Sequence, residues 1–280
     1  MNRIIACDLD GTLLNSSKQI STITANALQH EVKDGACIIP ATGRTLSGVP
    51  DEVLHLSGCT YLIAMNGAEV YALPKKKLLY KSYIPREIAL QVYDVATNFS
   101  SIRIEVFYNG YGLVTQQYYH ELLTAFENTS LKSYFESSRK SVPQPRKTIL
   151  QSEGLPEIAM FTDDINQMLT VRAKLQKICG IHCIQSACNY MEIISSFADK
   201  SFALKYIAEQ NNCTPQNIIA FGDGENDIAM LSYVGHGVAM GNGSDKVKAA
   251  SSAVTADNDH DGIAVYLNAF NSSNLLYSFY

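Results

Sequence analysis

The chain has 280 residues, of which 46% are hydrophobic and 18% charged, and its formal net charge at pH 7 is −5. This length favours two modest domains, and the composition excludes both a disordered chain and one that spans a lipid bilayer. The negative charge argues against binding to the phosphate backbone of nucleic acids, which requires concentrated lysine and arginine. We therefore expect a small-molecule partner, and neither a nucleic acid nor a membrane.

The start of the chain and its cysteines both indicate a reducing compartment. Residues 1–3 lead directly into an apolar run, which leaves no room for the charged and apolar regions of a signal peptide. The seven cysteines form no Cys-x-x-Cys pair, and several lie in apolar runs, so reduced core thiols fit better than zinc ligands or disulfides. We expect a cytoplasmic protein.

The first apolar run ends in two acids. Residues 3–7 are short and apolar, as in a parallel strand that is covered on both faces, and Asp8, Asp10 and Gly11 follow. On a continuing strand the two carboxylates would share one face, close enough to raise each other's proton affinity or to hold a cation. A lone Asp-x-Asp is more often a turn with a cap, so this motif needs support from elsewhere in the chain.

Two further strands end in polar residues. Residues 36–41 predict a strand that leads into Thr42, Gly43 and Arg44, and 61–65 predict a third strand. A strand–loop–helix junction of this kind aims backbone N–H groups at anions, although an N-cap with an incidental glycine is equally compatible with the residues. Strands that alternate with helices predict a doubly wound parallel sheet, in which sites lie beyond the carboxyl ends of the strands.

The middle of the chain has a different pattern of predicted strands and helices. Residues 84–190 mix strands and helices in an α+β pattern, so we predict that they form an inserted domain. The core would then consist of residues 1–83 and 191–280. Its doubly wound pattern resumes with a strand at 191–194.

The C-terminal part brings a lysine and a group of acids. Lys200 lies at a predicted helix start, where it is unfavourable against the helix dipole unless an anion is near; a solvated surface lysine is the alternative. The strand at 217–222 ends in Asp223, with Asn226 and Asp227 in the same turn. A hard divalent cation would relieve the repulsion among these acids, and Mg²⁺ favours one or two carboxylates together with phosphate oxygen.

Taken together, these motifs resemble those of the Cof-type (class IIB) haloacid dehalogenase-like phosphatases. The resemblance covers residues 1 to about 82 and 191 to about 270, and the motifs follow the order of the family. One departure is Ser201, where the family commonly has a glycine after its lysine; if the register were shifted, Lys205 would be the next candidate. The matching residues are Asp8-Leu9-Asp10-Gly11-Thr12, Ala41-Thr42-Gly43-Arg44, Asn66-Gly67, Lys200, Gly222-Asp223-Gly224-Glu225-Asn226-Asp227, Ala229-Met230-Leu231 and Val238-Ala239-Met240-Gly241-Asn242.

The resemblance implies an α/β fold: a doubly wound, Rossmann-like core with an inserted α+β cap of the C2B type. It implies that Asp8 is the nucleophile and Asp10 the general acid and base. The implied ligands of Mg²⁺ are the Asp8 carboxylate, the Asp10 main-chain carbonyl and Asp223, and the implied phosphate and substrate ligands are Thr42, Gly43, Arg44, Lys200 and Asn226. Thr12 and Asp227 would contact these ligands and hold them in position without binding Mg²⁺ or phosphate themselves.

The resulting prediction is an Mg²⁺-dependent hydrolase of small phosphomonoesters that works through an aspartyl-phosphate. The substrate would be a phosphorylated metabolite such as a sugar phosphate, pyridoxal phosphate or flavin mononucleotide, and the enzyme a monomer or weak homodimer. Two alternatives remain open. A phosphotransferase or phosphomutase could use the same intermediate, and a non-catalytic relative could only bind the phospho-ligand.

Overall fold

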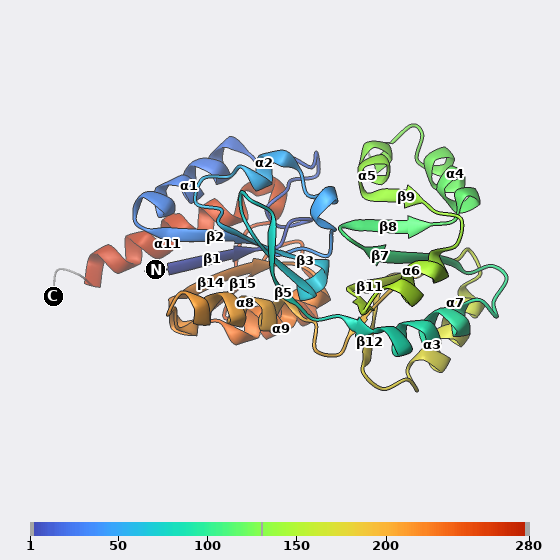
Figure 1. Cartoon of the computed structure of the whole chain (residues 1–280). Coiled ribbons are helices and arrows are strands. Elements are labelled where there is room, and N and C mark those ends of the chain that lie inside the picture. The colour runs from blue at the N-terminus through green and yellow to red at the C-terminus, as the bar shows by residue number, and fades with distance from the viewer. Residues whose placement is uncertain (1–2, 130, 278–280) are drawn as a thin grey trace. The chain divides into compact units, whose positions relative to one another are not determined.

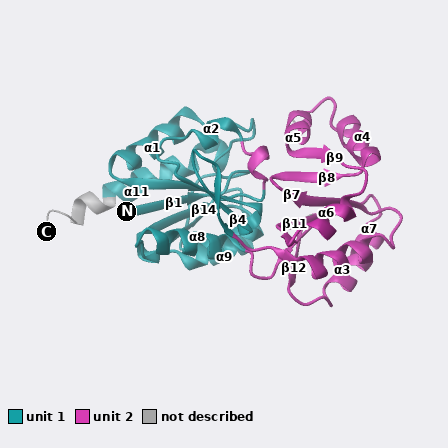
Figure 2. Ribbon diagram, in the orientation of Figure 1, with its two compact units in different colours: residues 1–43, 50–80, 199–280 teal, residues 44–49, 81–198 magenta. Residues whose placement is uncertain are grey.

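The computed structural model describes residues 3–129 and 131–277, and the chain divides into two compact units. Unit 1 contains residues 1–43, 50–80 and 199–280, and unit 2 contains residues 44–49 and 81–198 (Figure 2). These limits differ from the predicted domain limits mainly at residues 191–198, which lie in unit 2.

The core of unit 1 is a five-stranded sheet in the order β16-β15-β14-β1-β2, and every neighbouring pair is parallel (Figure 1). β1 lies inside the sheet, and its residues after Arg3 are buried, which explains its continuous apolar sequence. The predicted α/β fold class is confirmed. The strands are β1 (Arg3–Cys7), β2 (Ala36–Pro40), β14 (Ile218–Gly222), β15 (His236–Ala239) and β16 (Ala253–Val254).

Helices cover both faces of this sheet, with α1 and α11 together on one side and α8 and α9 on the other (Figure 1). Alternate strand residues serve the two layers: Ala220 packs with Leu204 of α8, whereas the ring of Phe221 meets Tyr266 of α11 edge to face. The helices are α1 (Thr22–Lys33), α2 (Asp51–Leu54), α8 (Lys200–Gln210), α9 (Ile228–Tyr233), α10 (Asp245–Ala250) and α11 (Gly262–Tyr277), with short 3₁₀ turns η1 (Leu46–Gly48, in unit 2), η2 (Met65–Gly67), η3 (Pro215–Asn217), η4 (Glu225–Asp227) and η5 (Asn258–His260).

The third predicted strand pairs differently from the prediction. Isolated parallel bridges join Ile38 to Cys59 and Ala41 to Ile63, at the ends of β2 and β3 (Tyr61–Ala64). The main partner of β3 is the antiparallel strand β4 (Glu69–Ala72), whose other neighbour is β5 (Lys77–Lys81). The cause is the turn between them, where Met65, Asn66 and Gly67 all have positive φ and reverse the chain. The prediction that β3 belongs to the parallel sheet was wrong in this respect.

Unit 2 is built on a six-stranded sheet in the order β12-β13-β11-β7-β8-β9, in which β8 and β9 are parallel and the other pairs antiparallel. β13 contains residues 191–194, whose predicted place was the core; an apolar run does not specify which of two sheets it joins. The elements are β6 (Ile84–Pro85), α3 (Arg86–Ala96), β7 (Arg103–Tyr108), β8 (Tyr111–Val114), α4 (Gln116–Ala125), α5 (Leu131–Ser138), β9 (Arg139–Ser141), α6 (Pro145–Gln151), β10 (Gly154–Leu155), β11 (Glu157–Phe161), α7 (Ile165–Leu175), β12 (Ile181–Ala187) and β13 (Tyr190–Ser195).

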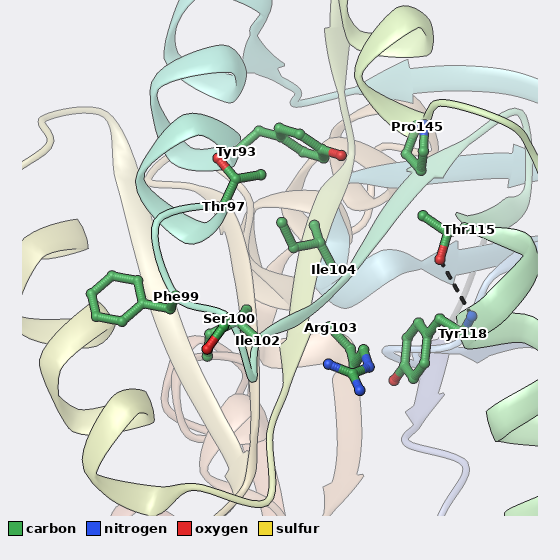
Figure 3. Close-up of a pocket in the computed structure, with 10 residues that line it drawn as sticks. All are labelled: Tyr93, Thr97, Phe99, Ser100, Ile102, Arg103, Ile104, Thr115, Tyr118 and Pro145. Carbon is green, nitrogen blue, oxygen red and sulfur yellow. Dashed lines mark hydrogen bonds between the residues drawn. The ribbon is translucent and has the colours of Figure 1, made fainter.

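Unit 2 also contains a cavity of about 270 Å³ beside the start of β7 (Figure 3). Its charged lining residue, Arg103, is already engaged by Glu121 at 2.8 Å. The lining residues labelled in Figure 3 include no acid, histidine or cysteine. Among residues 3–129 and 131–277, no helix has the length and apolar character needed to cross a bilayer.

Candidate active site

The predicted motifs meet at one edge of the parallel sheet. Asp8, Thr42 and Asp223 follow the neighbouring strands β1, β2 and β14, and the backbone N–H of Asp8 still bonds to the carbonyl of Phe221 at 3.0 Å. The carboxyl ends of adjacent parallel strands lie together, so the sheet itself assembles these side chains.

The centre of this group is a buried lysine between two acids. Lys200 Nζ donates hydrogen bonds of 2.6 Å to Asp8 Oδ1 and of 2.6 Å to Asp227 Oδ1. The three residues are 1%, 7% and 0% exposed, so a solvated surface lysine is excluded. Lys200 is the first residue of α8, where the Asp199 side chain caps the N–H of Ser201, so serine at this position leaves the helix start intact.

The charges of this group do not balance. Burial acts to lower the pKa of Lys200, but the two acids outweigh it and raise that pKa above its usual value, so the ammonium stays charged. Burial raises the pKa of Asp8 from 3.8 to about 8, opposed by Lys200 and supported by Asp227. One ammonium thus faces two carboxyl groups, with Asp223 nearby, and the second acid is compensated either by a proton on Asp8 or by an additional cation.

A divalent cation fits this environment. Carboxylate oxygens of Asp8, Asp223 and Asp227 lie within 4.8 Å of one another, and hard cations prefer such ligands. The oxygens of Asp227 are already used, since Oδ1 accepts from Lys200 and Oδ2 accepts from the N–H groups of Asp223 at 3.1 Å and Gly224 at 3.0 Å. The oxygens of Asp223 accept one side-chain hydrogen bond each, and Asp223 is less buried than Asp227, so Asp8 and Asp223 are the better candidate ligands and Asp227 is a candidate for orienting Lys200.

Polar neighbours and a glycine fix the position of Asp223. Thr12 Oγ1 donates to its Oδ1 at 2.9 Å, and Asn242 Nδ2 donates to its Oδ2 at 3.2 Å. Gly11 has φ of +82°, and a Cβ there would lie 2.4 Å from Asp223 Oδ2, so only glycine allows this approach. Burial raises the pKa of Asp223, which Thr12 opposes.

A second group of amides lies beside the β2 tip. Asn226 Nδ2 donates to Asn66 Oδ1 at 3.0 Å, and Asn66 N donates to the carbonyl of Thr42 at 3.0 Å. A Cβ on Gly43 would lie 3.0 Å from Asn66 Oδ1. The structure thus brings together Thr42, Gly43 and Asn226, the predicted phosphate ligands.

Two predicted residues have other partners. Asp10 is outside the acid cluster, and its Oδ1 accepts from Lys18 Nζ at 2.7 Å. Arg44 belongs to unit 2, where it donates to the carbonyl of Gly48 at 3.0 Å and lies 5.1 Å from the centre of the Tyr134 ring. Their roles in proton transfer and substrate binding stay predictions.

Asn66 and Asn242 were missed as individual site residues. Both lie inside the motifs that resemble those of the family, but their positions in the site depend on contacts with Asn226 and with Asp223, which no spacing reveals. The signal that could have found them is an amide shortly after a strand end, in a sheet whose other strands also end in polar residues.

Comparison with known proteins agrees with this geometry. A sequence model of one family, described as haloacid dehalogenase-like hydrolase, matches residues 5–267. The chain belongs to the haloacid dehalogenase-like hydrolases. The resemblance to the Cof-type phosphatases of this family is thereby confirmed.

Two relatives and one solved structure are similar to this hydrolase over almost their whole length. The 5-amino-6-(5-phospho-D-ribitylamino)uracil phosphatase YitU of Bacillus subtilis is 28% identical, with 95% of this chain and 97% of the relative covered. The phosphatase YwpJ of the same bacterium is 30% identical, with 94% and 97% covered. A solved haloacid dehalogenase-like hydrolase from B. subtilis has a TM-score of 0.80 at 27% identity, covering 95% of this chain and 99% of that one. The chain is accordingly a phosphatase-type enzyme of this family.

Proposed function

We propose that this enzyme hydrolyses small phosphomonoesters with Mg²⁺, through an aspartyl-phosphate on Asp8. The observation that carries the proposal is the buried Lys200 ammonium, 2.6 Å from a carboxylate that also belongs to a possible metal group. A dianionic phosphate cannot approach Asp8 without such positive charge, because two unit charges 4 Å apart repel by about 4 kcal/mol at an intermediate dielectric.

The proposed reaction has two displacements. First, an oxygen of Asp8 forms a bond to phosphorus while the ester P–O bond breaks, and the carboxyl group of Asp10 gives its proton to the departing oxygen. Then a water attacks phosphorus, Asp10 takes its proton, and the bond between phosphorus and Asp8 breaks. Thr42, Gly43, Asn226 and Lys200 would hold the phosphoryl oxygens throughout.

Asp8, Asp223 and the main-chain carbonyl of Asp10 would hold Mg²⁺. When bound, the cation would neutralise charge on the phosphoryl oxygens and favour the ionised form of Asp8. Mg²⁺ is proposed over other divalent ions because these ligands are all oxygens and the substrate adds phosphate oxygen.

The substrate class follows from the family and its named relatives. One relative is a phosphatase of a ribitylaminouracil phosphate, and the pyridoxal phosphate phosphatase YbhA of Escherichia coli is 29% identical over 95% of this chain and 97% of its own. We infer a phosphorylated metabolite of similar size: a sugar phosphate, pyridoxal phosphate or flavin mononucleotide. A cytoplasmic location, a monomer or weak homodimer, and a role of unit 2 as the cap that selects the ester belong to the same proposal.

A phosphomonoester panel tests the proposal. With Mg²⁺ present, we expect release of inorganic phosphate from at least one of these metabolites, with kcat/KM far above that for a folded phosphoprotein. Preferential transfer of phosphate to an added sugar or alcohol would favour the phosphotransferase, and tight binding without turnover would favour the non-catalytic alternative. Either result, or efficient hydrolysis of the phosphoprotein, would contradict the proposed hydrolase.

Asp223→Ala is expected to weaken Mg²⁺ binding on the order of 100-fold or more, since even changes behind direct metal ligands cost about 10–100-fold. Burial raises the pKa values of both Asp223 and Asp8, so Mg²⁺ must displace protons, and wild-type affinity should increase as the pH rises toward 8. Calorimetric titration at several pH values measures both effects. Glu225→Ala is the matched control, because this exposed neighbour pairs with Lys246. Equal affinities in the two variants would exclude Asp223 as a ligand.

A further inference from the structure

Lys18 makes a contact to Asp10 that the chemistry above does not use. Its Nζ lies 2.7 Å from Asp10 Oδ1, and the two side chains are 42% and 41% exposed. An ion pair so open to water adds little to stability, because solvent screens it and two side chains must be ordered. A contribution to stability therefore does not explain why Lys18 is held beside Asp10.

The backbone of Lys18 is held in an uncommon conformation. Its φ is +60°, in the left-handed region that residues other than glycine rarely adopt. Hydrogen bonds close the turn around it: Lys18 N donates to Asn15 O at 2.8 Å, Asn15 N to Gln19 O at 3.0 Å, and Gln19 N to Asn15 Oδ1 at 3.0 Å. The turn is thus built to present this side chain in one direction.

A distant part of the chain anchors the same turn. Asp259 accepts from Ser16 N at 2.8 Å and from Ser16 Oγ at 2.5 Å, and Asn258 Nδ2 donates to Leu14 O at 2.9 Å. The residues just before Lys18 are therefore fixed to another part of unit 1. Local strain supported by long-range contacts is a sign of a functional position.

We propose that Lys18 is a positioning residue, which fixes the direction in which Asp10 presents its carboxyl group to the leaving-group oxygen. This inference rests on the proposed function. The ammonium donates to a carboxyl oxygen whether Asp10 holds the proton or has given it away, so the contact persists through both displacements. Proton transfer depends on hydrogen-bond geometry. If the Asp10 side chain rotated freely, it would spend less time in the orientation that hydrogen-bonds to the leaving oxygen.

The test compares leaving groups. The 4-nitrophenolate ion departs without a proton, whereas an alkoxide needs one, so loss of general acid orientation should affect alkyl phosphates selectively. kcat/KM is the right quantity, because it reports the steps up to phosphorylation of Asp8 and excludes the hydrolysis step common to all esters. The assay uses the full-length enzyme with Mg²⁺, 4-nitrophenyl phosphate and the best alkyl ester of the metabolite panel.

For Lys18→Met we expect kcat/KM to fall about 10-fold on the alkyl ester, a part of the roughly 10²–10⁴-fold that general acid catalysis contributes. On 4-nitrophenyl phosphate it should change less than about twofold, since that step needs little acid assistance. Lys18→Arg should restore most of the loss. Asp259→Ala, which loosens the turn without touching Asp10, should show the same selectivity with a smaller effect, and Ser17→Ala, in the same exposed turn, should behave as wild type.

Equal losses on both esters, no loss on either, or a gain for Lys18→Met would overturn the inference. Wild-type hydrolysis of the two esters distinguishes its failure from that of the proposed function. If the wild type hydrolyses neither ester, the proposed function fails and this inference falls with it. If the wild type is active and Lys18→Met shows no selectivity, only the role of Lys18 is refuted.

Discussion

Asp8→Asn is expected to abolish turnover, on the order of a 10⁴-fold loss or more, while leaving the fold intact. The amide has the shape of the carboxylate and still accepts a hydrogen bond from Lys200, but it cannot attack phosphorus. Phosphate release from the best ester of the panel measures this loss, and Asp163→Asn, an exposed acid in unit 2, is the control. Turnover close to wild type would remove Asp8 from the role of nucleophile.

The same variant also tests the raised pKa of Asp8, through its melting temperature measured in the absence of Mg²⁺. The folded-state pKa of Asp8 is raised to about 8 from 3.8, so the folded protein keeps a proton that the unfolded chain releases. This group therefore favours folding less and less as the pH rises from about 4 to 8. The amide of Asp8→Asn does not titrate, so the melting temperature of the variant relative to wild type should increase between pH 5 and pH 8. A difference that is constant with pH would contradict the raised pKa.

The parts of the site that could be predicted are those that a short stretch of sequence specifies. Asp8 and Asp223 each follow a short apolar run, and the parallel arrangement alone brings such strand ends together. The environment of Lys200 could not be settled in this way. The helix dipole argued for an anion nearby, but the pairing with Asp227 spans 27 residues and depends on how α8 packs beside the β14 tip.

The errors in the fold have a similar origin. β3 has the composition of a core strand, and a run of positive φ angles at Met65, Asn66 and Gly67 turned the chain back to pair with β4. Asn66-Gly67 is a turn signal, but it is equally compatible with a loop at the end of a parallel strand. β13 is apolar like a core strand, but its register with β11 and β12 is set by partners elsewhere in unit 2. Period and composition identify a strand, whereas its partners are decided by the tertiary contacts of its side chains.

Lys200→Met is expected to lower phosphatase activity about 10²–10³-fold, less than Asp8→Asn does, because it removes a stabilising charge and not the reacting atom. Methionine keeps most of the buried length and leaves Asp8 and Asp227 without their shared cation. Steady-state kinetics with the best ester measures the loss. Lys205→Ala is the matched control, since this lysine of the same helix has a side chain that is 56% exposed and lies 4.0 Å from Glu209.

Stability should fall together with activity in Lys200→Met, in contrast to Asp8→Asn. Breaking a buried ion pair by removing one partner costs about 3–5 kcal/mol, because the remaining charge stays buried. Because its pKa is raised to about 8, Asp8 already holds a proton for most of the time at pH 7, and the Oδ2 of Asp227 keeps its backbone donors, so we expect about 3 kcal/mol at pH 7, the lower end of that range. Denaturant unfolding of both variants without Mg²⁺ makes the comparison. If Lys200→Met were as stable and as active as Lys205→Ala, the buried ammonium would be required neither for stability nor for catalysis. That result would contradict the main argument for the proposed function.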